Sequence, residues 1–124
     1  MNILIIEDDK ILAKRIQQTF ERTVITNRIT VLYSYEEFVS HMCDISYYDI
    51  ILTDIWLNSY FEKNWLDIVK YIRKKNNQTP IVMISAYNDI SMIQEAFKQW
   101  ANDYLVKPFR LQELEIRALR WFNS

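Results

Sequence analysis

Glycine is absent from all 124 residues of the sequence, although it makes up about 7% of an average protein. Turns that need a positive φ must therefore use other residues, among which asparagine tolerates that conformation well. Phosphate-binding loops of the GxxxxGK[ST] type and dinucleotide-binding turns of the GxGxxG type both depend on glycine. Both kinds of loop are excluded, so any phosphate chemistry in this protein must use side chains and a metal ion.

Cysteine, histidine and excess positive charge are also scarce. Cys43 is the only cysteine and His41 the only histidine, which excludes an internal disulfide and predicts a reducing, cytoplasmic setting. The net charge of −1 lacks the basic character of a nucleic-acid-binding domain. No apolar run approaches the ~18 residues of a membrane span, and the N-terminus does not have the pattern of a signal peptide. We therefore expect neither membrane nor nucleic-acid binding by these residues.

Short, largely apolar runs are each followed directly by charged or hydroxyl residues. Runs without polar alternation are typical of strands in a parallel sheet, because helices cover both of its faces. Ligands of such sheets bind outside the carboxyl ends of the strands. The runs are Ile3–Ile6, Ile50–Thr53, Ile81–Ile84 and Tyr104–Val106, and the residues that follow them are Glu7, Asp8 and Asp9, then Asp54, Ser85 and Lys107. This pattern predicts that these side chains meet at one edge of the sheet.

Segments of helical period alternate with the apolar runs, and residues 29–32 form a further strand. Five helices are predicted. The first follows Asp9, and the second runs from the capping box at Ser34 and Glu37 to about Met42. The third includes Trp65–Ile72, the fourth runs from Asn88 or Asp89 to about Trp100, and the fifth spans Arg110–Trp121. The sum is five βα units in one domain, 1–124. We predict a flavodoxin-like three-layer α/β sandwich with a parallel five-stranded sheet of order 2-1-3-4-5.

Carboxylates gather at the ends of two neighbouring strands of this sheet. Glu7, Asp8 and Asp54 would repel one another unless a cation lay between them, and Mg²⁺ prefers carboxylate and phosphate oxygens. A single aspartate after a strand is often only a helix N-cap, which is our interpretation of Asp9. Three acids on adjacent strand ends favour a Mg²⁺ site.

Asp54 is the best candidate nucleophile because it stands alone at the end of the central strand. A carboxylate beside Mg²⁺ can form an aspartyl phosphate. Phosphoryl transfer needs mainly alignment and neutralisation of charge. Lys107 would pair with the phosphoryl oxygens, and the hydroxyl of Ser85 would donate a hydrogen bond to one of them.

These motifs and their order make the whole chain resemble the receiver domain of bacterial two-component response regulators. The matching motifs are Glu7-Asp8, Asp54, Ser85-Ala86, Tyr104 and Lys107-Pro108-Phe109. The resemblance implies that Asp54 accepts a phosphoryl group from the phosphohistidine of a sensor histidine kinase. It implies that Mg²⁺ is held by Glu7, Asp8, Asp54 and the backbone carbonyl of Trp56. It also implies that Ser85 and Tyr104 form a switch pair and that the Lys107-Pro108 bond is cis.

The end of the chain is similar to receivers of the OmpR/PhoB type, which dimerise through the fourth helix, fifth strand and fifth helix. The matching positions of that face are Ile93, Phe97, Asp103, Glu113 and Arg117, although Ile93 stands where a basic partner is usual. The alternative, solvated surface charges, stays open because exposed pairs contribute only ~0–1 kcal/mol. The chain is then either a stand-alone receiver or the N-terminal domain of a longer DNA-binding regulator, and the last helix favours the second.

The segment after Asp54 departs from the family pattern. The loop 57–64 is longer than usual, and Asn64-Trp65 replaces the usual Asp-Gly. We hypothesise that bulky Trp56 and Tyr87 shield an aspartyl phosphate from water. The changes also allow a pseudo-receiver, a phosphorylation-independent interaction module, although the retained acids argue against it. A multiple-turnover Mg²⁺-dependent phosphohydrolase is disfavoured, because Trp56 occupies the position of its acid/base aspartate and cannot transfer a proton.

Overall fold

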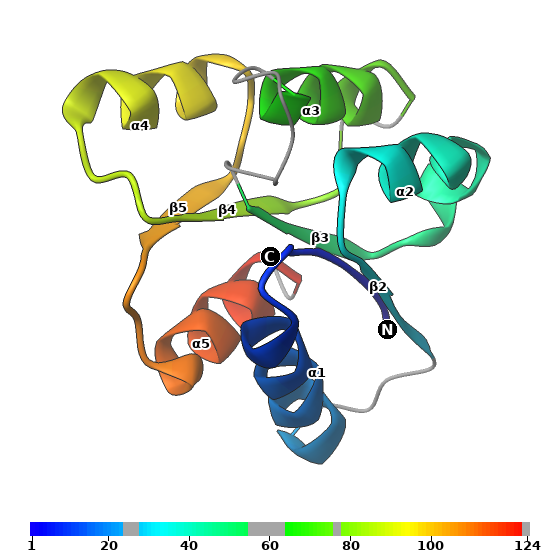
Figure 1. The fold of residues 1–124 in the computed structure, drawn as a ribbon, viewed down its shortest axis with the longest axis vertical. Helices are drawn as coiled ribbons and strands as arrows, with labels where there is room; N and C mark the ends of the chain where they lie inside the picture. Colours follow the sequence, from blue (N-terminus) through cyan, green and yellow to red (C-terminus); the bar gives the residue numbers. More distant parts are fainter. Residues whose placement is uncertain (24–27, 55–63, 76–77, 123–124) are drawn as a thin grey trace.

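Strands and helices alternate along the whole chain (Figure 1). The structure, a computed structural model, describes residues 1–23, 28–54, 64–75 and 78–122. In chain order the elements are β1 (Asn2–Ile6), α1 (Lys10–Thr23), β2 (Arg28–Leu32), α2 (Tyr35–Ser40), the 3-10 helix η1 (Met42–Tyr47), β3 (Ile50–Asp54), α3 (Asn64–Lys75), β4 (Ile81–Ser85), α4 (Ile90–Lys98), β5 (Asp103–Val106) and α5 (Leu111–Phe122). Within the described ranges, every helix is too short or too polar to cross a membrane.

The five strands form one parallel sheet of order β2-β1-β3-β4-β5, which confirms the predicted topology. The register places Ile6 opposite Thr53, so Glu7 and Asp54 come next on neighbouring strands. Ser85 is opposite Val106, so Lys107 follows beside it. The register therefore brings the predicted site residues to one edge of the sheet.

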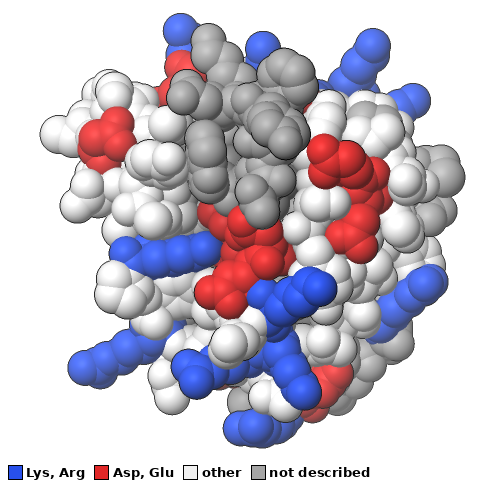
Figure 2. Space-filling model, viewed as in Figure 1, with Lys and Arg blue, Asp and Glu red and all other residues white. Residues whose placement is uncertain are grey.

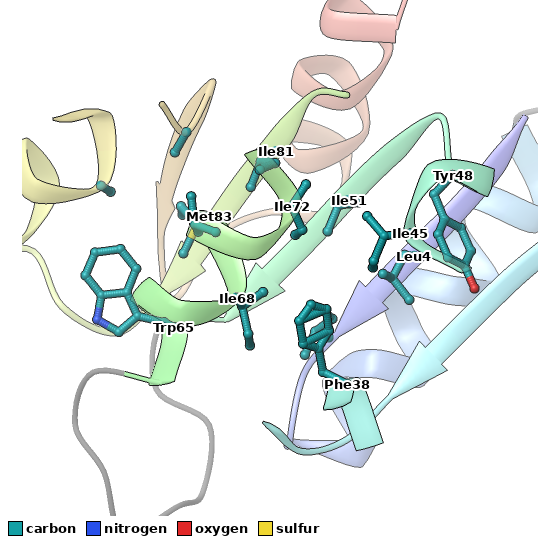
Figure 3. Close-up of a cluster of buried hydrophobic side chains, with 14 of the residues drawn as sticks. Leu4, Phe38, Ile45, Tyr48, Ile51, Trp65, Ile68, Ile72, Ile81 and Met83 are labelled. Atoms are coloured by element: carbon teal, nitrogen blue, oxygen red, sulfur yellow. The ribbon is translucent and has the colours of Figure 1, made fainter. Parts of the chain in front are cut away.

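Helices cover both faces of the sheet, as Figure 1 shows: α2, α3 and α4 lie on one face, and α1 and α5 lie on the other. Alternate strand residues point to opposite faces, so Leu4 and Met83 belong to one core while Ile5 and Val82 belong to the other. Figure 3 shows the first core, where Phe38 and Ile68 pack against the strands. Because both faces are covered, the central strands are mostly apolar along their length.

Side-chain caps begin three of the helices where the sequence predicted them. Asp9 Oδ1 accepts hydrogen bonds from the backbone N–H groups of residues 11 and 12 in α1. Ser34 Oγ accepts one from Glu37 N, and Asp89 accepts one from Met92 N. The Glu37 carboxylate accepts from the N–H of Tyr33, one residue before the cap. The helix predicted to reach Met42 is shorter, since α2 ends at Ser40 and η1 follows.

The end of α4 also differs from the prediction, which extended the helix to about Trp100. Trp100 N donates to Phe97 O at 3.0 Å and Ala101 N donates to Ala96 O at 3.1 Å, the hydrogen bonds of a Schellman C-cap. Trp100 has φ of 71°, in the left-handed region that glycine usually occupies at this position. The apolar period continues through Trp100, but the backbone has already turned towards β5.

Candidate functional site

The acidic side chains predicted to hold a cation lie together at the carboxyl edge of the sheet. Carboxylate oxygens of Glu7, Asp8 and Asp54 lie within 4.8 Å of one another. Glu7 is fully buried and Asp54 is 3% exposed, whereas Asp8 is half-buried. Figure 2 shows acidic side chains gathered at the centre of this face, with basic side chains beside them.

Lys107 reaches into this cluster from the end of β5. Its Nζ lies 2.7 Å from Glu7 Oε1 and 3.1 Å from Asp54 Oδ2. The other oxygen of Glu7 accepts a hydrogen bond from Asp9 N at 3.0 Å. The backbone N–H of Lys107 donates to Ser85 O at 2.6 Å, and the Lys107-Pro108 bond is cis, as predicted. One ammonium thus bridges two of the three acids.

The electrostatics of the cluster favour a further positive charge. Burial, and to a smaller extent the charge of Asp54, raises the pKa of Glu7 to about 8, although Lys107 opposes this shift. Burial by itself would lower the pKa of Lys107, but its pairs with Glu7 and Asp54 outweigh burial and raise it. Three carboxylates around one ammonium leave negative charge uncompensated.

A hard divalent cation fits this set of oxygen donors. Mg²⁺ binds through carboxylates and retains waters or phosphate oxygens as its other ligands. Glu7, Asp8 and Asp54 supply the carboxylates, and the uncompensated charge gives a cation an electrostatic reason to bind. The fourth predicted ligand, the backbone carbonyl of Trp56, lies outside the described residues.

Ser85 and Tyr104 lie together, and the backbone of Tyr87 holds both of them. Ser85 Oγ accepts a hydrogen bond from Tyr87 N at 2.9 Å, and Tyr104 Oη donates to Tyr87 O at 2.7 Å. Ser85 is fully buried and Tyr104 is nearly so. Burial raises the pKa of Tyr104, and a hydrogen bond with Ser85 opposes that shift. The sequence analysis missed this role of Tyr87, since the contacts are made by backbone atoms that every residue has.

The residues predicted to form an interaction face are distributed over α4, β5 and α5. Phe97 is 45% exposed, Ile93 is partly buried, and Glu113 is exposed. Asp103, by contrast, is buried, and its carboxylate accepts hydrogen bonds from α5. The donors are Arg117 at 2.8 Å, Arg120 at 3.3 Å and the indole N–H of Trp121 at 3.1 Å.

Asp103 therefore joins the start of β5 to the end of α5, a role that the sequence analysis missed. The spacing of Arg117, Arg120 and Trp121 at i, i+3 and i+4 places them on one side of a helix, which is the signal that could have indicated a shared acceptor. Arg117 also approaches Glu113, at 3.4 Å.

A groove opens beside the acidic cluster, between the start of α1 and the segment that follows β5. Its volume is about 310 Å³. Ile11, Arg15, Lys107 and Phe109 are among its lining residues, and Ile11 is largely exposed. The groove gives a partner protein a surface directly next to Lys107.

The sequence matches a known family and several known proteins. The sequence family described as "Response regulator receiver domain" matches residues 3–119. The chain is 31% identical over 125 residues to the transcriptional regulatory protein CrdR of Helicobacter pylori, covering 98% of the chain and 55% of CrdR. It is 34% identical over 121 residues to the response regulator ArlR of Staphylococcus aureus, covering 94% of the chain and 51% of ArlR. The chain thus spans about half the length of these two relatives.

Solved structures show the same architecture. The receiver domain of the Francisella response regulator 1452 superimposes with a TM-score of 0.81 at 30% identity, covering 98% of this chain and 96% of that one. A two-component response regulator from Clostridium difficile superimposes with a TM-score of 0.84 at 28% identity, covering 100% of this chain and 99% of that one.

The raised pKa of Glu7 predicts a pH-dependent stability in the absence of divalent cations. The folded protein binds a proton more tightly than the unfolded chain between pH 4.5 and about 8, so raising the pH through this window destabilises the fold. One pKa unit corresponds to ~1.4 kcal/mol, so the free energy of unfolding should fall by a few kcal/mol. Denaturant unfolding in EDTA across this range measures the fall.

The matched control is Glu7→Gln, which keeps the side-chain shape but cannot titrate. Its stability should depend less on pH, and Mg²⁺ should restore stability to the unsubstituted protein at high pH. Equal pH dependence of the two proteins would contradict the assignment of the titration to Glu7.

Proposed function

Since this chain belongs to the response regulator receiver domain family, we propose that it is a phosphorylation-activated switch that accepts a phosphoryl group on Asp54. The observation that carries the proposal is the placement of Lys107, whose ammonium lies 3.1 Å from the Asp54 carboxylate within the acidic cluster. The cluster has a nucleophile, a cation for the phosphoryl oxygens and carboxylates for Mg²⁺ within one small volume.

The proposed reaction is transfer from a phosphohistidine. An Asp54 oxygen attacks phosphorus, an O–P bond forms, and the P–N bond to the imidazole breaks. Lys107 turns from the carboxylates to the new phosphoryl oxygens, which carry the negative charge. Mg²⁺ held by Glu7, Asp8, Asp54 and the Trp56 carbonyl would neutralise charge on the phosphoryl group. Slow hydrolysis of the acyl phosphate returns Asp54 to its starting state. Because the domain accepts a phosphoryl group and loses it only slowly, it would not act as a multiple-turnover enzyme.

Ser85, Tyr104 and Tyr87 form the proposed link from the phosphoryl group to the protein surface. A phosphoryl oxygen on Asp54 would compete with Tyr104 for the Ser85 hydroxyl. Because Tyr87 contacts both side chains through its backbone, a change in either contact alters the segment that leads into α4. The surface formed by α4, β5 and α5 would then change on phosphorylation.

Two partners follow from this function. A sensor histidine kinase would dock in the groove beside Lys107, where exposed Ile11 offers an apolar contact. A second copy would pack on the α4-β5-α5 face of the activated domain, through Ile93, Phe97, Asp103, Glu113 and Arg117. Asp103 and Arg117 pair within the chain, so apolar contacts at Phe97 would carry most of the dimer's stability.

The biological setting is that of the OmpR/PhoB type. We propose that residues 1–124 form the N-terminal receiver of a longer cytoplasmic regulator. Relatives about twice this length are named as a transcriptional regulatory protein and a response regulator, which supports an output domain beyond the receiver. DNA binding would belong to that output domain and not to these residues, whose net charge is −1.

Phosphorylation of Asp54 is tested by mass spectrometry after incubation with Mg²⁺ and acetyl phosphate. We expect one phosphoryl adduct, lost in Asp54→Asn and retained in Asp49→Asn, a matched change at the opposite edge of the sheet. No adduct on the unsubstituted protein would support the pseudo-receiver instead. Sustained release of phosphate from many monoesters would support the hydrolase.

The shielding role of Tyr87 is tested on the phosphorylated protein. Tyr87→Ser keeps the backbone contacts to Ser85 and Tyr104 but removes the ring, so water should reach the acyl phosphate more easily. We expect dephosphorylation to become a few-fold faster. The rate is measured by mass spectrometry as the loss of the phosphoryl adduct over time. Tyr47→Ser, at an exposed tyrosine beside Arg28, is the control and should leave the rate unchanged. Equal rates in both variants would exclude shielding by Tyr87.

Dimerisation is tested by sedimentation with and without beryllofluoride, which mimics the phosphoryl group. We expect beryllofluoride to promote dimers, and Phe97→Asp to weaken them at least about tenfold, or ~1.4 kcal/mol, because a charge would be buried. Ile11→Asp places the same charge on exposed α1 and should leave dimerisation unchanged. A dimer insensitive to Phe97→Asp would place the contact on another face.

A further inference from the structure

Trp100 adopts a left-handed backbone conformation that is unfavourable for a residue with a large side chain. It is the residue after the C-cap of α4, with φ of 71°, and it makes the Schellman hydrogen bonds described above. A bulky side chain in the left-handed region costs free energy that glycine avoids and asparagine largely avoids. Asparagine occupies loop positions 88 and 102, so the chain uses a residue that adopts this conformation at lower cost in other loops.

The side chain of Trp100 adds little to the packing of this domain. It is 75% exposed, the most exposed of the large apolar side chains in the described part of the chain. A residue with an unfavourable backbone conformation and a solvent-exposed indole does not stabilise the fold, so stability does not explain why tryptophan occupies this position. Such residues persist where they contact something outside the domain.

A rigid set of hydrogen bonds holds the backbone beneath this indole. Arg73 of α3 donates from Nε to Trp100 O at 2.9 Å, from Nη1 to Thr79 O at 2.7 Å, and from Nη2 to Asn102 Oδ1 at 2.7 Å. Asn102 Oδ1 also accepts from Ile81 N, at 2.9 Å. Trp100 is therefore presented from a fixed platform, which lowers the entropy that binding would cost.

Exposed lysines lie on the two helices that meet at Trp100. Lys98 is in the last turn of α4, and Lys70 and Lys74 flank Arg73 on α3. The nearest acid on α4, Glu95, is half-buried and hydrogen-bonded to Gln99, and Asp67 lies a turn before Lys70 on α3. Figure 2 shows basic side chains projecting along the α3 and α4 side of the molecule. Exposed lysines thus outnumber exposed acids on the parts of α3 and α4 that lie near Trp100 in the chain or beside Arg73.

We propose that Trp100, Lys70, Lys74 and Lys98 form a docking surface for an acidic segment of a partner protein. An apolar side chain of that segment would cover the indole while its carboxylates pair with the lysines, and exposed aromatic anchors with a charged rim are typical of binding hot spots. A nucleic acid is a poorer match, because it needs an extended row of phosphate contacts, whereas this surface offers one apolar anchor with three lysines.

This surface lies at the amino edge of the sheet, before β5, whereas Asp54 lies at the carboxyl edge. The indole is exposed in the unphosphorylated domain, so binding here does not require the proposed phosphoryl chemistry. The surface would let the domain hold a partner before phosphorylation.

The test uses a short fluorescent peptide with a leucine-phenylalanine pair flanked by glutamates, and fluorescence anisotropy at low salt. We expect binding that weakens at least about tenfold in Trp100→Asn and in the Lys74→Glu/Lys98→Glu variant. Asparagine adopts the left-handed conformation, so Trp100→Asn should unfold at the same temperature or higher. Ile90→Asn is the matched control. Ile90 is 72% exposed at the other end of α4, so its replacement should leave peptide binding unchanged.

Several outcomes would overturn the proposal. They are absence of peptide binding, equal binding by Trp100→Asn, and equal binding of a peptide with lysines in place of glutamates. Trp100-dependent binding to anionic lipid vesicles without binding to the peptide would assign the surface to a membrane. Self-association in sedimentation that is lost in Trp100→Asn would assign it to a second copy of the chain.

Discussion

The edge of the sheet is organised around one electrostatic constraint: three carboxylates lie close together, and a single ammonium pairs with two of them. The parallel register forces Glu7 and Asp54 onto neighbouring strand ends, and burial prevents water from compensating their charge. Burial, and to a smaller extent the charge of Asp54, raises the pKa of Glu7 to about 8, and Lys107 opposes this shift only in part. A site in this state gains stability from a bound cation, which would also let the ammonium turn to a bound anion. Both are what a phosphoryl acceptor with Mg²⁺ requires.

The surroundings of this cluster connect it to the rest of the fold through backbone atoms. Tyr87 contacts Ser85 and Tyr104 by its N–H and carbonyl, and the helix α4 begins three residues later. At the other end of α4, Arg73 holds the turn at Trp100. Asp103 ties the next strand to the end of α5. The helix α4 is thus linked at its start to the acceptor site and at its end to a fixed platform.

Much of the fold could be predicted because both faces of the sheet are covered. Burial on both faces makes the central strands largely apolar runs, and the acids, hydroxyl and lysine that follow mark where the runs end. The strand order and the meeting of Glu7, Asp54, Ser85 and Lys107 followed from that pattern and from the family resemblance. Element ends were harder to predict. The apolar period of α4 continues through Trp100, although the backbone leaves the helix before it, and nothing in residues 42–47 signalled a 3-10 helix.

The sequence by itself determined which groups could carry the proposed chemistry: the absence of glycine excluded glycine-based phosphate loops, and the order of acids, hydroxyl and lysine predicted Mg²⁺ and an acceptor aspartate. Only the tertiary structure decided how those groups are paired. Lys107 could have faced the solvent, Asp103 could have been a free surface charge, and Tyr87 could have been only a bulky neighbour. Such pairings depend on distances of a few ångströms between residues far apart in the chain. Strand register, helix packing and burial set those distances, and residue type alone does not.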